Sequence, residues 1–78
     1  MKINTLIIDD SPSWREILTR LVKMNPLLNL VAVCESALEA YTHIANDSIQ
    51  LIICDIEMTP ISGLEFIKNL NNPPLVIF

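Results

Sequence analysis

The stretch LIICDIEMTPISG, residues 51–63, decides the fold of this chain. Its first four residues, Leu51–Cys54, form an apolar run that is too short for a typical helix and lacks the 3.6-residue spacing of one. Such a run predicts a strand buried on both faces, as in a parallel sheet covered by helices. Asp55 ends the run at the carboxyl end of the strand, where ligands bind in open parallel sheets. Asp55 is therefore a candidate functional residue; the alternative is that its carboxylate only caps the following turn.

A strand with the same kind of ending is predicted at Ile3–Asp9, which is followed directly by Asp10. Ser11 and Pro12 then mark a helix start, with Ser11 as N-cap and Pro12 at the first helical position, where its missing N–H costs nothing. This helix is expected to run to about residue 24, and its apolar positions at helical spacing are expected to lie in or near the core: Trp14, Ile17, Leu18, Leu21 and Val22.

The rest of the chain continues the alternation of strands and helices. Capping boxes open two further helices, Ser36 with Glu39 and Ser62 with Glu65. The predicted strands are 28–34, 50–55 and a buried strand at 75–78. A helix is predicted from 36 to 46 or 47, with four buried side chains: Leu38, Tyr41, Ile44 and Ala45. Another helix is predicted from 62, with three buried side chains: Leu64, Ile67 and Leu70.

This order predicts an α/β fold in a single domain, because alternating strands and helices with short loops form a parallel sheet with helices on both faces. A chain of 78 residues with 51% hydrophobic residues has enough apolar surface for such a small core. Gly63 is the only glycine, which excludes the glycine-rich phosphate loops of nucleotide-binding proteins.

Composition excludes several other classes. The net charge is −4 with five basic residues, so we expect no nucleic-acid binding by this chain. No apolar run approaches the roughly 20 residues of a membrane span, and we expect a cytoplasmic protein without membrane contact. Cys34 and Cys54 each end a strand, and if both flank the first strand they lie about 9 to 10 Å apart, too far for a disulfide. We expect both thiols to be reduced and buried.

Three carboxylates are expected to meet at one sheet edge if strands 3–9 and 50–55 are neighbours: those of Asp9, Asp10 and Asp55. Two carboxylates about 4 Å apart repel by about 4 kcal/mol at an effective dielectric of about 20, so the cluster needs a proton or a cation. Hard oxygen ligands favour Mg²⁺. Asp55 beside Mg²⁺ has the chemistry of a carboxylate nucleophile that forms an aspartyl-phosphate.

These motifs, namely residues 9–12 (DDSP), 55–58 (DIEM) and 62–66 (SGLEF), resemble the receiver domain of two-component response regulators over the whole chain. Residues 25–26 and 72–78 further resemble the receivers of LytTR-type transcriptional regulators. The resemblance implies a flavodoxin-like sheet of strand order 2-1-3-4, with Asp55 as phosphoacceptor. It also implies Mg²⁺ bound directly by Asp10 and Asp55, through water by Asp9, and by the Glu57 backbone carbonyl.

The resemblance implies a signalling role as well. A sensor histidine kinase is the expected phosphodonor, a separate DNA-binding domain the expected output, and no enzyme activity beyond self-catalysed phosphoryl transfer is expected. Residues 1–78 would be the N-terminal part of a receiver, without its fifth strand and last helices. We expect such a piece to self-associate through the edge of strand 75–78 or the uncovered sheet face. Thr59-Pro60 departs from the family, whose proline stands one place earlier.

Two alternatives remain at this point. Asp55, Glu57 and Thr59 are similar to the D-x-D-x-T motif of haloacid-dehalogenase-like phosphohydrolases, with Glu57 as general acid/base. That motif belongs on the first strand and leaves Asp9-Asp10 unexplained. The other alternative is a receiver-like interaction module without metal, for which a Mg²⁺ titration would show no saturable response.

Overall fold

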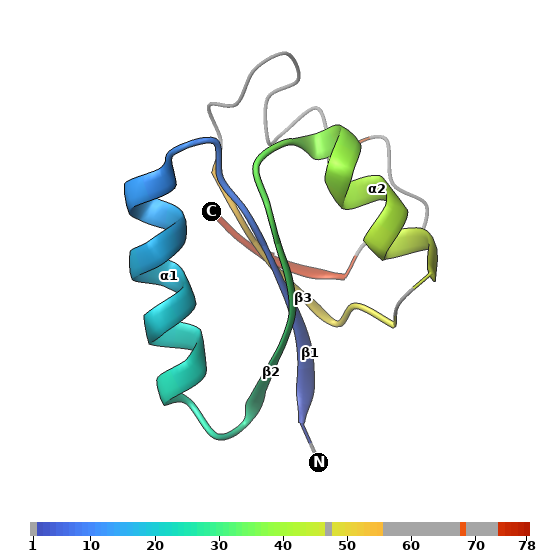
Figure 1. The fold of residues 1–78 in the computed structure, drawn as a ribbon. Helices are drawn as coiled ribbons and strands as arrows, with labels where there is room; N and C mark the ends of the chain where they lie inside the picture. Colours follow the sequence, from blue (N-terminus) through green and yellow to red (C-terminus); the bar gives the residue numbers. More distant parts are fainter. Residues whose placement is uncertain (1, 47, 56–67, 69–73) are drawn as a thin grey trace.

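The computed structural model describes residues 2–46, 48–55, 68 and 74–78. The elements are β1 (Ile3–Ile8), α1 (Pro12–Met24), β2 (Leu28–Cys34), α2 (Ala37–Asn46), β3 (Leu51–Cys54) and β4 (Leu75–Ile77) (Figure 1). All four strands are parallel, in the order β2-β1-β3-β4. The predicted α/β sheet and its order 2-1-3-4 are confirmed. The predicted third helix lies outside the described residues except for Lys68, which is helical.

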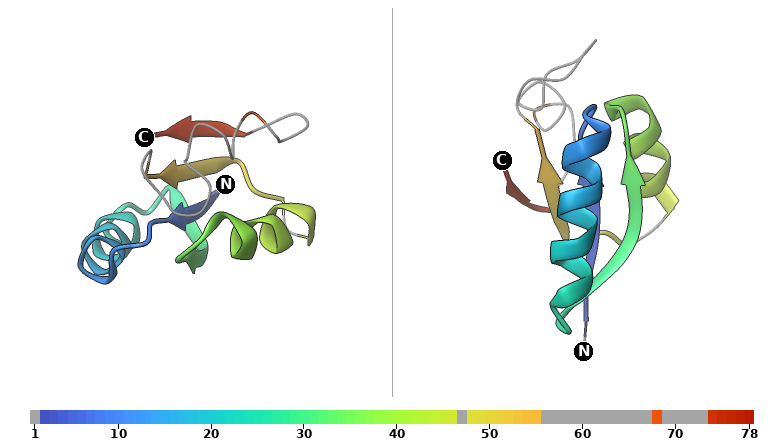
Figure 2. Two further views of the ribbon diagram at one scale, coloured as in Figure 1. Left: turned by 90° about the horizontal axis from the view of Figure 1, so that it is seen from above. Right: turned by 60° about the vertical axis from the view of Figure 1, so that its left-hand side comes forward.

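Helices α1 and α2 cover opposite faces of the sheet in the described part of the chain (Figure 2). The main core lies under α2. Ala37 and Ala40 of this helix pack on the alternate side chains of the strands that point to the same face: Leu6, Ile8, Cys34, Ile52 and Cys54. The alternation places these residues together because successive side chains of a strand point to opposite faces.

The two cysteines flank the end of β1. Ile8 is in register with Cys34 on one side and with Cys54 on the other. Both thiols are free and buried, as predicted. Burial raises the pKa of each from 9.0 to about 11; the charge of Glu39 adds to the rise for Cys34, and the charges of Asp55 and Asp9 add to it for Cys54. Thiols of this kind are poor nucleophiles at neutral pH.

Several apolar side chains that were predicted to be buried are exposed. On α1, Val22 is buried, whereas Trp14, Ile17 and Leu21 are exposed. On α2, Leu38 is 78% exposed. Leu21 and Leu38 each lie one residue from a buried position, and one residue is a rotation of about 100° on a helix, which turns the side chain away from the sheet.

Strand β4 also differs from its prediction as a buried strand. It is an outer strand of the sheet, paired with β3 on one side. Leu75, Ile77 and Phe78 are all at least half exposed. Ala45 on α2 is exposed too. In each case the apolar pattern shows which side chains could be buried. Whether a side chain is buried depends on which element packs against it. None of the helices in the described part of the chain has the length and apolar character needed to span a membrane.

Candidate functional site

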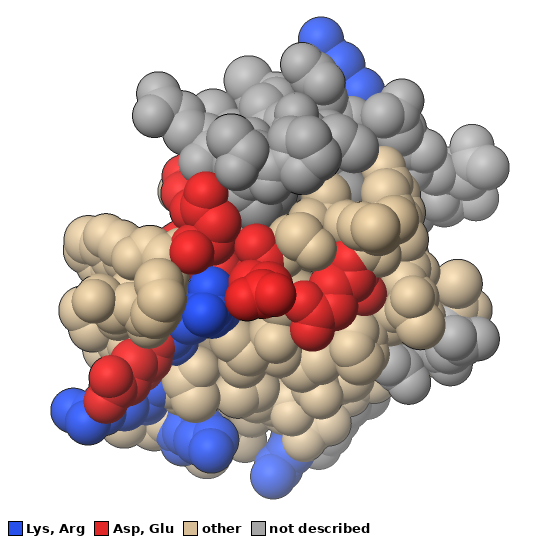
Figure 3. Space-filling model, turned by 45° about the horizontal axis from the view of Figure 1, so that its top comes forward, with Lys and Arg blue, Asp and Glu red and all other residues tan. Residues whose placement is uncertain are grey.

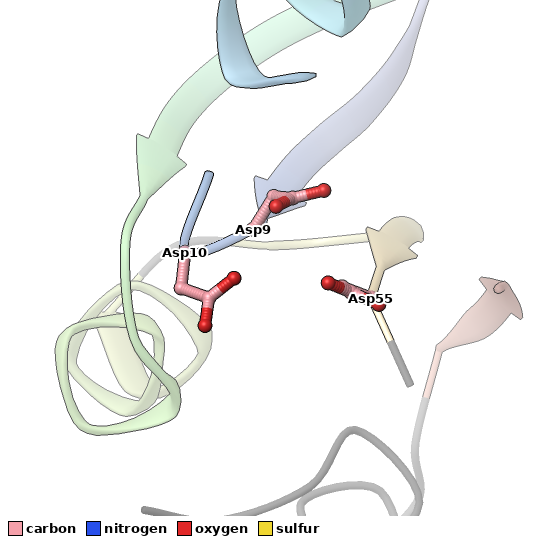
Figure 4. Close-up of side chains that lie close together, drawn as sticks. All are labelled: Asp9, Asp10 and Asp55. Carbon is pink, nitrogen blue, oxygen red and sulfur yellow. The ribbon is translucent and has the colours of Figure 1, made fainter. Parts of the chain in front are cut away.

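The carboxyl ends of β1 and β3 place three aspartates at one edge of the sheet. The Asp9 N–H donates to the Cys34 carbonyl at 3.0 Å, and the Asp55 N–H donates to the Ile8 carbonyl at 3.0 Å. These two bonds continue the hydrogen bonding of the sheet one residue beyond each strand. They fix the backbone of Asp9 and Asp55 at the ends of neighbouring strands, and Figure 4 shows the two side chains close to one another there.

The turn between β1 and α1 is held by its own side chains. The Ser11 N–H donates to Asp9 Oδ1 at 2.9 Å, an Asx turn that orients this carboxylate. Ser11 Oγ accepts from the Trp14 N–H at 3.5 Å, and Pro12 is the first helical residue. The predicted N-cap is thus confirmed, and it directs the chain away from the sheet immediately after Asp10.

One carboxylate oxygen from each of Asp9, Asp10 and Asp55 lies within 4.8 Å of the other two (Figure 4). Asp9 is buried, Asp55 is half-buried and Asp10 is exposed, so the cluster opens to solvent on one side. The predicted convergence of the three carboxylates is therefore observed. The fourth predicted ligand, the Glu57 carbonyl, and the neighbouring Thr59 lie outside the described residues.

The electrostatics of this edge favour a bound cation. Ionised carboxylates no more than 4.8 Å apart repel one another, and solvent at the exposed Asp10 screens part of this repulsion. The Ser11 N–H offsets part of the charge on Asp9. Acidic side chains gather on this face of the molecule (Figure 3). An added cation would therefore relieve repulsion as well as gain ligands.

The three carboxylates fit Mg²⁺ on the chemistry of the donors and on distance. The group contains oxygen ligands only, which hard cations prefer. Mg²⁺ binds oxygens at about 2.0–2.1 Å in an octahedron, so two direct ligands are at most about 4.2 Å apart. A set spanning 4.8 Å is slightly wider than that limit. Two direct carboxylates and a third bound through water suit this spacing.

One residue beside the site was missed in the sequence. Arg15, in the first turns of α1, donates from Nη1 to the Asp9 backbone carbonyl at 2.9 Å. Its Nη2 lies 4.0 Å from Glu35 Oε2 in the turn after β2. The sequence offered one signal for Arg15, its position four residues, or about one helical turn, after the N-cap Ser11. This position does not reveal which group Arg15 contacts.

Comparison with known proteins supports one assignment. A family model for the response regulator receiver domain matches residues 5–78. The structure is similar to the response regulator domain of Thermotoga maritima CheB, with a TM-score of 0.88 and 28% identity over 97% of this chain and 58% of that one. It is also similar to a response regulator receiver protein from Pseudomonas putida, with a TM-score of 0.73 and 31% identity over 87% of this chain and 55% of that one.

A curated relative is similar over most of this chain. The protein-glutamate methylesterase/protein-glutamine glutaminase 2 of Vibrio vulnificus (strain YJ016) is 32% identical over 69 residues, which are 88% of this chain and 20% of the relative. The chain spans about a fifth of the length of the curated relatives it matches. Because one family model spans residues 5–78 and two solved receiver structures share the fold, the chain belongs to the response regulator receiver domain family.

Proposed function

We propose that this chain is a phosphoacceptor, in which Asp55 takes a phosphoryl group from the phosphohistidine of a sensor histidine kinase. The observation that carries the proposal is the convergence of Asp9, Asp10 and Asp55 within 4.8 Å at the carboxyl edge of the sheet. In this proposal Asp10 and Asp55 would bind Mg²⁺ directly, Asp9 would bind it through water, and the Glu57 carbonyl would be a further ligand. Two-component signalling by receiver domains takes place in the cytoplasm, where we place this protein.

The chemistry follows from the position of each carboxylate. An Asp55 carboxylate oxygen attacks the phosphorus, the P–N bond breaks, and its electron pair goes to the imidazole, which is protonated as it leaves. The product is a mixed anhydride on Asp55. When bound, Mg²⁺ supplies positive charge that offsets the charge of the phosphoryl oxygens. The backbone bond from Asp55 to Ile8 holds the nucleophile beside Asp9 and Asp10, so that catalysis is mainly positioning.

The output of the protein is a separate matter. The curated relatives carry methylesterase and glutaminase names, and their matched part is about a fifth of their length. We infer that any enzyme activity of a longer protein would belong to another domain, and that this domain itself only transfers the phosphoryl group. The LytTR-type, DNA-binding output stays a prediction that these relatives do not support.

The alternatives differ in support. The phosphohydrolase alternative does not explain Asp9 and Asp10, and the family match favours the receiver. An interaction module without metal is the competing proposal, and Mg²⁺ titration separates the two. Self-association also stays a prediction. It is supported by the position of β4 at the sheet edge and by the exposure of Leu75 and Ile77, and light scattering in solution tests it.

Intact-mass analysis after incubation with Mg²⁺ and acetyl phosphate tests the phosphoacceptor role. We expect the protein to gain one phosphoryl mass, which hydroxylamine removes because it cleaves acyl phosphates. Asp55→Asn should gain none, and Glu16→Gln, an exposed substitution on α1, should behave as wild type. Equal modification of wild type and Asp55→Asn, or no modification of either, would contradict the proposal.

A further inference from the structure

Arg15 contacts the backbone of the acidic site rather than its carboxylates. Its side chain is only 22% exposed, although the residue is charged. Nη1 donates to the Asp9 carbonyl at 2.9 Å, and Nη2 lies 4.0 Å from Glu35 Oε2. The Asp9 carbonyl belongs to the peptide unit that joins Asp9 to Asp10. One guanidinium thus connects α1, the turn after β1 and the turn after β2.

The contact is made to the peptide unit from which the Asp10 residue starts. A peptide unit is planar, so a fixed carbonyl direction also fixes the N–H and the direction in which the next Cα leaves. Asp9 is buried and is oriented further by the Ser11 N–H. Asp10 is exposed and gains little from packing. The orientation of the Asp9–Asp10 peptide therefore acts together with the Asx turn and the Ser11 N-cap in setting where the Asp10 carboxylate lies.

We infer that Arg15 is a positioning residue for divalent-cation binding: it holds the Asp9–Asp10 peptide so that the three carboxylates converge. The inference rests on the proposed function, because it assigns a role toward the cation that the three aspartates would hold. Arg15 does not touch the cation in this arrangement. It acts through the Asp9 carbonyl.

Charge and positioning make opposite predictions for this residue. Arg15 is a cation near a cation site, and through its charge alone it would weaken the binding of Mg²⁺. Removing the charge would then tighten binding. If positioning dominates, removing the side chain loosens the Asp9–Asp10 peptide and weakens binding, as substitutions outside the direct ligands of a metal commonly do. The direction of the change therefore identifies the role.

Lysine at this position separates the two effects further. Arg15→Lys keeps the positive charge but replaces a planar fork by a single ammonium group. The fork reaches the Asp9 carbonyl and Glu35 with different nitrogens, which one ammonium cannot do in the same geometry. An electrostatic role predicts no change for Arg15→Lys, whereas a positioning role predicts weaker binding.

Isothermal titration with Mg²⁺ alone tests the inference on the full 78-residue chain. We expect the Kd to rise about 10-fold in Arg15→Gln and about 3-fold in Arg15→Lys. Arg20→Gln is the matched control: Arg20 lies on the same helix, 2.8 Å from Glu16, with a side chain that is 76% exposed. Its Kd should stay within about twofold of wild type, since an exposed pair of this kind contributes little.

Amide hydrogen exchange gives a readout that does not depend on Mg²⁺. The Ser11 N–H bonded to Asp9 should exchange faster in Arg15→Gln and Arg15→Lys than in wild type or Arg20→Gln. Far-UV circular dichroism checks that each variant is folded. If Arg15→Gln does not fold, Arg15→Lys decides the test.

The outcomes are distinct. Weaker Mg²⁺ binding in Arg15→Lys with faster exchange at Ser11 supports the inference. Tighter binding in Arg15→Gln, or unchanged binding in Arg15→Lys, overturns it. A wild-type chain without saturable Mg²⁺ binding would overturn the proposed function instead. In that case the exchange rate of the Ser11 N–H alone would decide whether Arg15 holds the Asp9–Asp10 peptide. An unchanged rate in the two Arg15 variants would show that it does not.

Discussion

The parallel strands carry different kinds of side chain at their two ends, here called the amino edge and the carboxyl edge of the sheet. The amino edge carries amides. Asn4 Nδ2 donates to the Ser48 carbonyl at 2.9 Å, Asn29 Nδ2 donates to Asn4 Oδ1 at 3.0 Å, and the Asn4 N–H donates to Gln50 Oε1 at 3.0 Å. The carboxyl edge carries Asp9, Asp10 and Asp55.

The difference lies in what each group can bond to. An amide both donates and accepts, so Asn4, Asn29 and Gln50 satisfy one another and join β1, β2 and the residue before β3. An ionised carboxylate only accepts, so three of them cannot satisfy one another and their charges repel. The amino edge therefore stabilises the fold, whereas the carboxyl edge is suited to an external cation or phosphoryl group.

The largest expected effect is on cation affinity. Asp10→Asn removes one charged ligand, and we expect the Kd for Mg²⁺ to rise about 100-fold, at the upper end of effects seen around metal sites. Asn4→Ala, at the other edge, should leave the Kd within about twofold. Isothermal titration of both variants measures the contrast, and a similar loss in both would show that the edges are not functionally distinct.

The second effect concerns stability. Asn4→Ala removes two side-chain hydrogen bonds, to Ser48 and from Asn29, and we expect it to lower the free energy of unfolding by about 1.5 kcal/mol. Urea unfolding followed by circular dichroism measures this. Glu16→Gln, which only breaks an exposed ion pair on α1, should cost at most about 0.5 kcal/mol. Equal losses would mean that the amide cluster contributes no more than an ordinary surface pair.

Alkaline pH should lower the free energy of unfolding through the two cysteines near the carboxyl edge. The pKa of Cys54 and of Cys34 is raised in the folded chain from 9.0 to about 11. The folded state therefore keeps protons that the unfolded state loses, so the stabilisation is full below about pH 9 and is lost as pH rises from 9 through 11. We expect a loss of about 1 kcal/mol per thiol between about pH 8 and pH 10.

Urea unfolding of wild type and Cys54→Ala at these two pH values checks this prediction. The variant should lose less stability on going to the higher pH, by about the contribution of one thiol. Identical pH dependence in both proteins would mean that the Cys54 thiol is not buried in the folded state.

The smallest expected effect is a gain in stability, opposite in sign to the loss expected for Asn4→Ala. Without Mg²⁺, Asp10→Asn should stabilise the chain by about 0.5 kcal/mol, because it relieves repulsion at a partly solvated and screened site. Adding Mg²⁺ should stabilise wild type and have much less effect on the variant. Thermal unfolding with and without Mg²⁺ measures both. A destabilised Asp10→Asn would show that this carboxylate has a structural role in the metal-free fold.

Much of the site was predictable because its parts are local in the sequence. The acids directly follow two apolar runs, and Ser11-Pro12 marks a helix start. The prediction failed where partners come from elsewhere. Leu38 and Ile17 lie on apolar patterns, yet they are exposed because α2 packs through Ala37 and Ala40, and α1 buries Val22. Arg15 was missed for the same reason, since its carbonyl and carboxylate partners lie in two separate turns.

The sequence by itself determined the order of strands and helices and the placement of carboxylates at two strand ends, because periodicity and caps depend on neighbours a few residues away. The resemblance to receivers already implied that β1 lies between β2 and β3, as observed. Only the tertiary structure decided which apolar faces are covered and that Arg15 reaches the peptide between Asp9 and Asp10. These features depend on contacts between residues far apart in the chain, and no local pattern specifies which of several possible partners will be met.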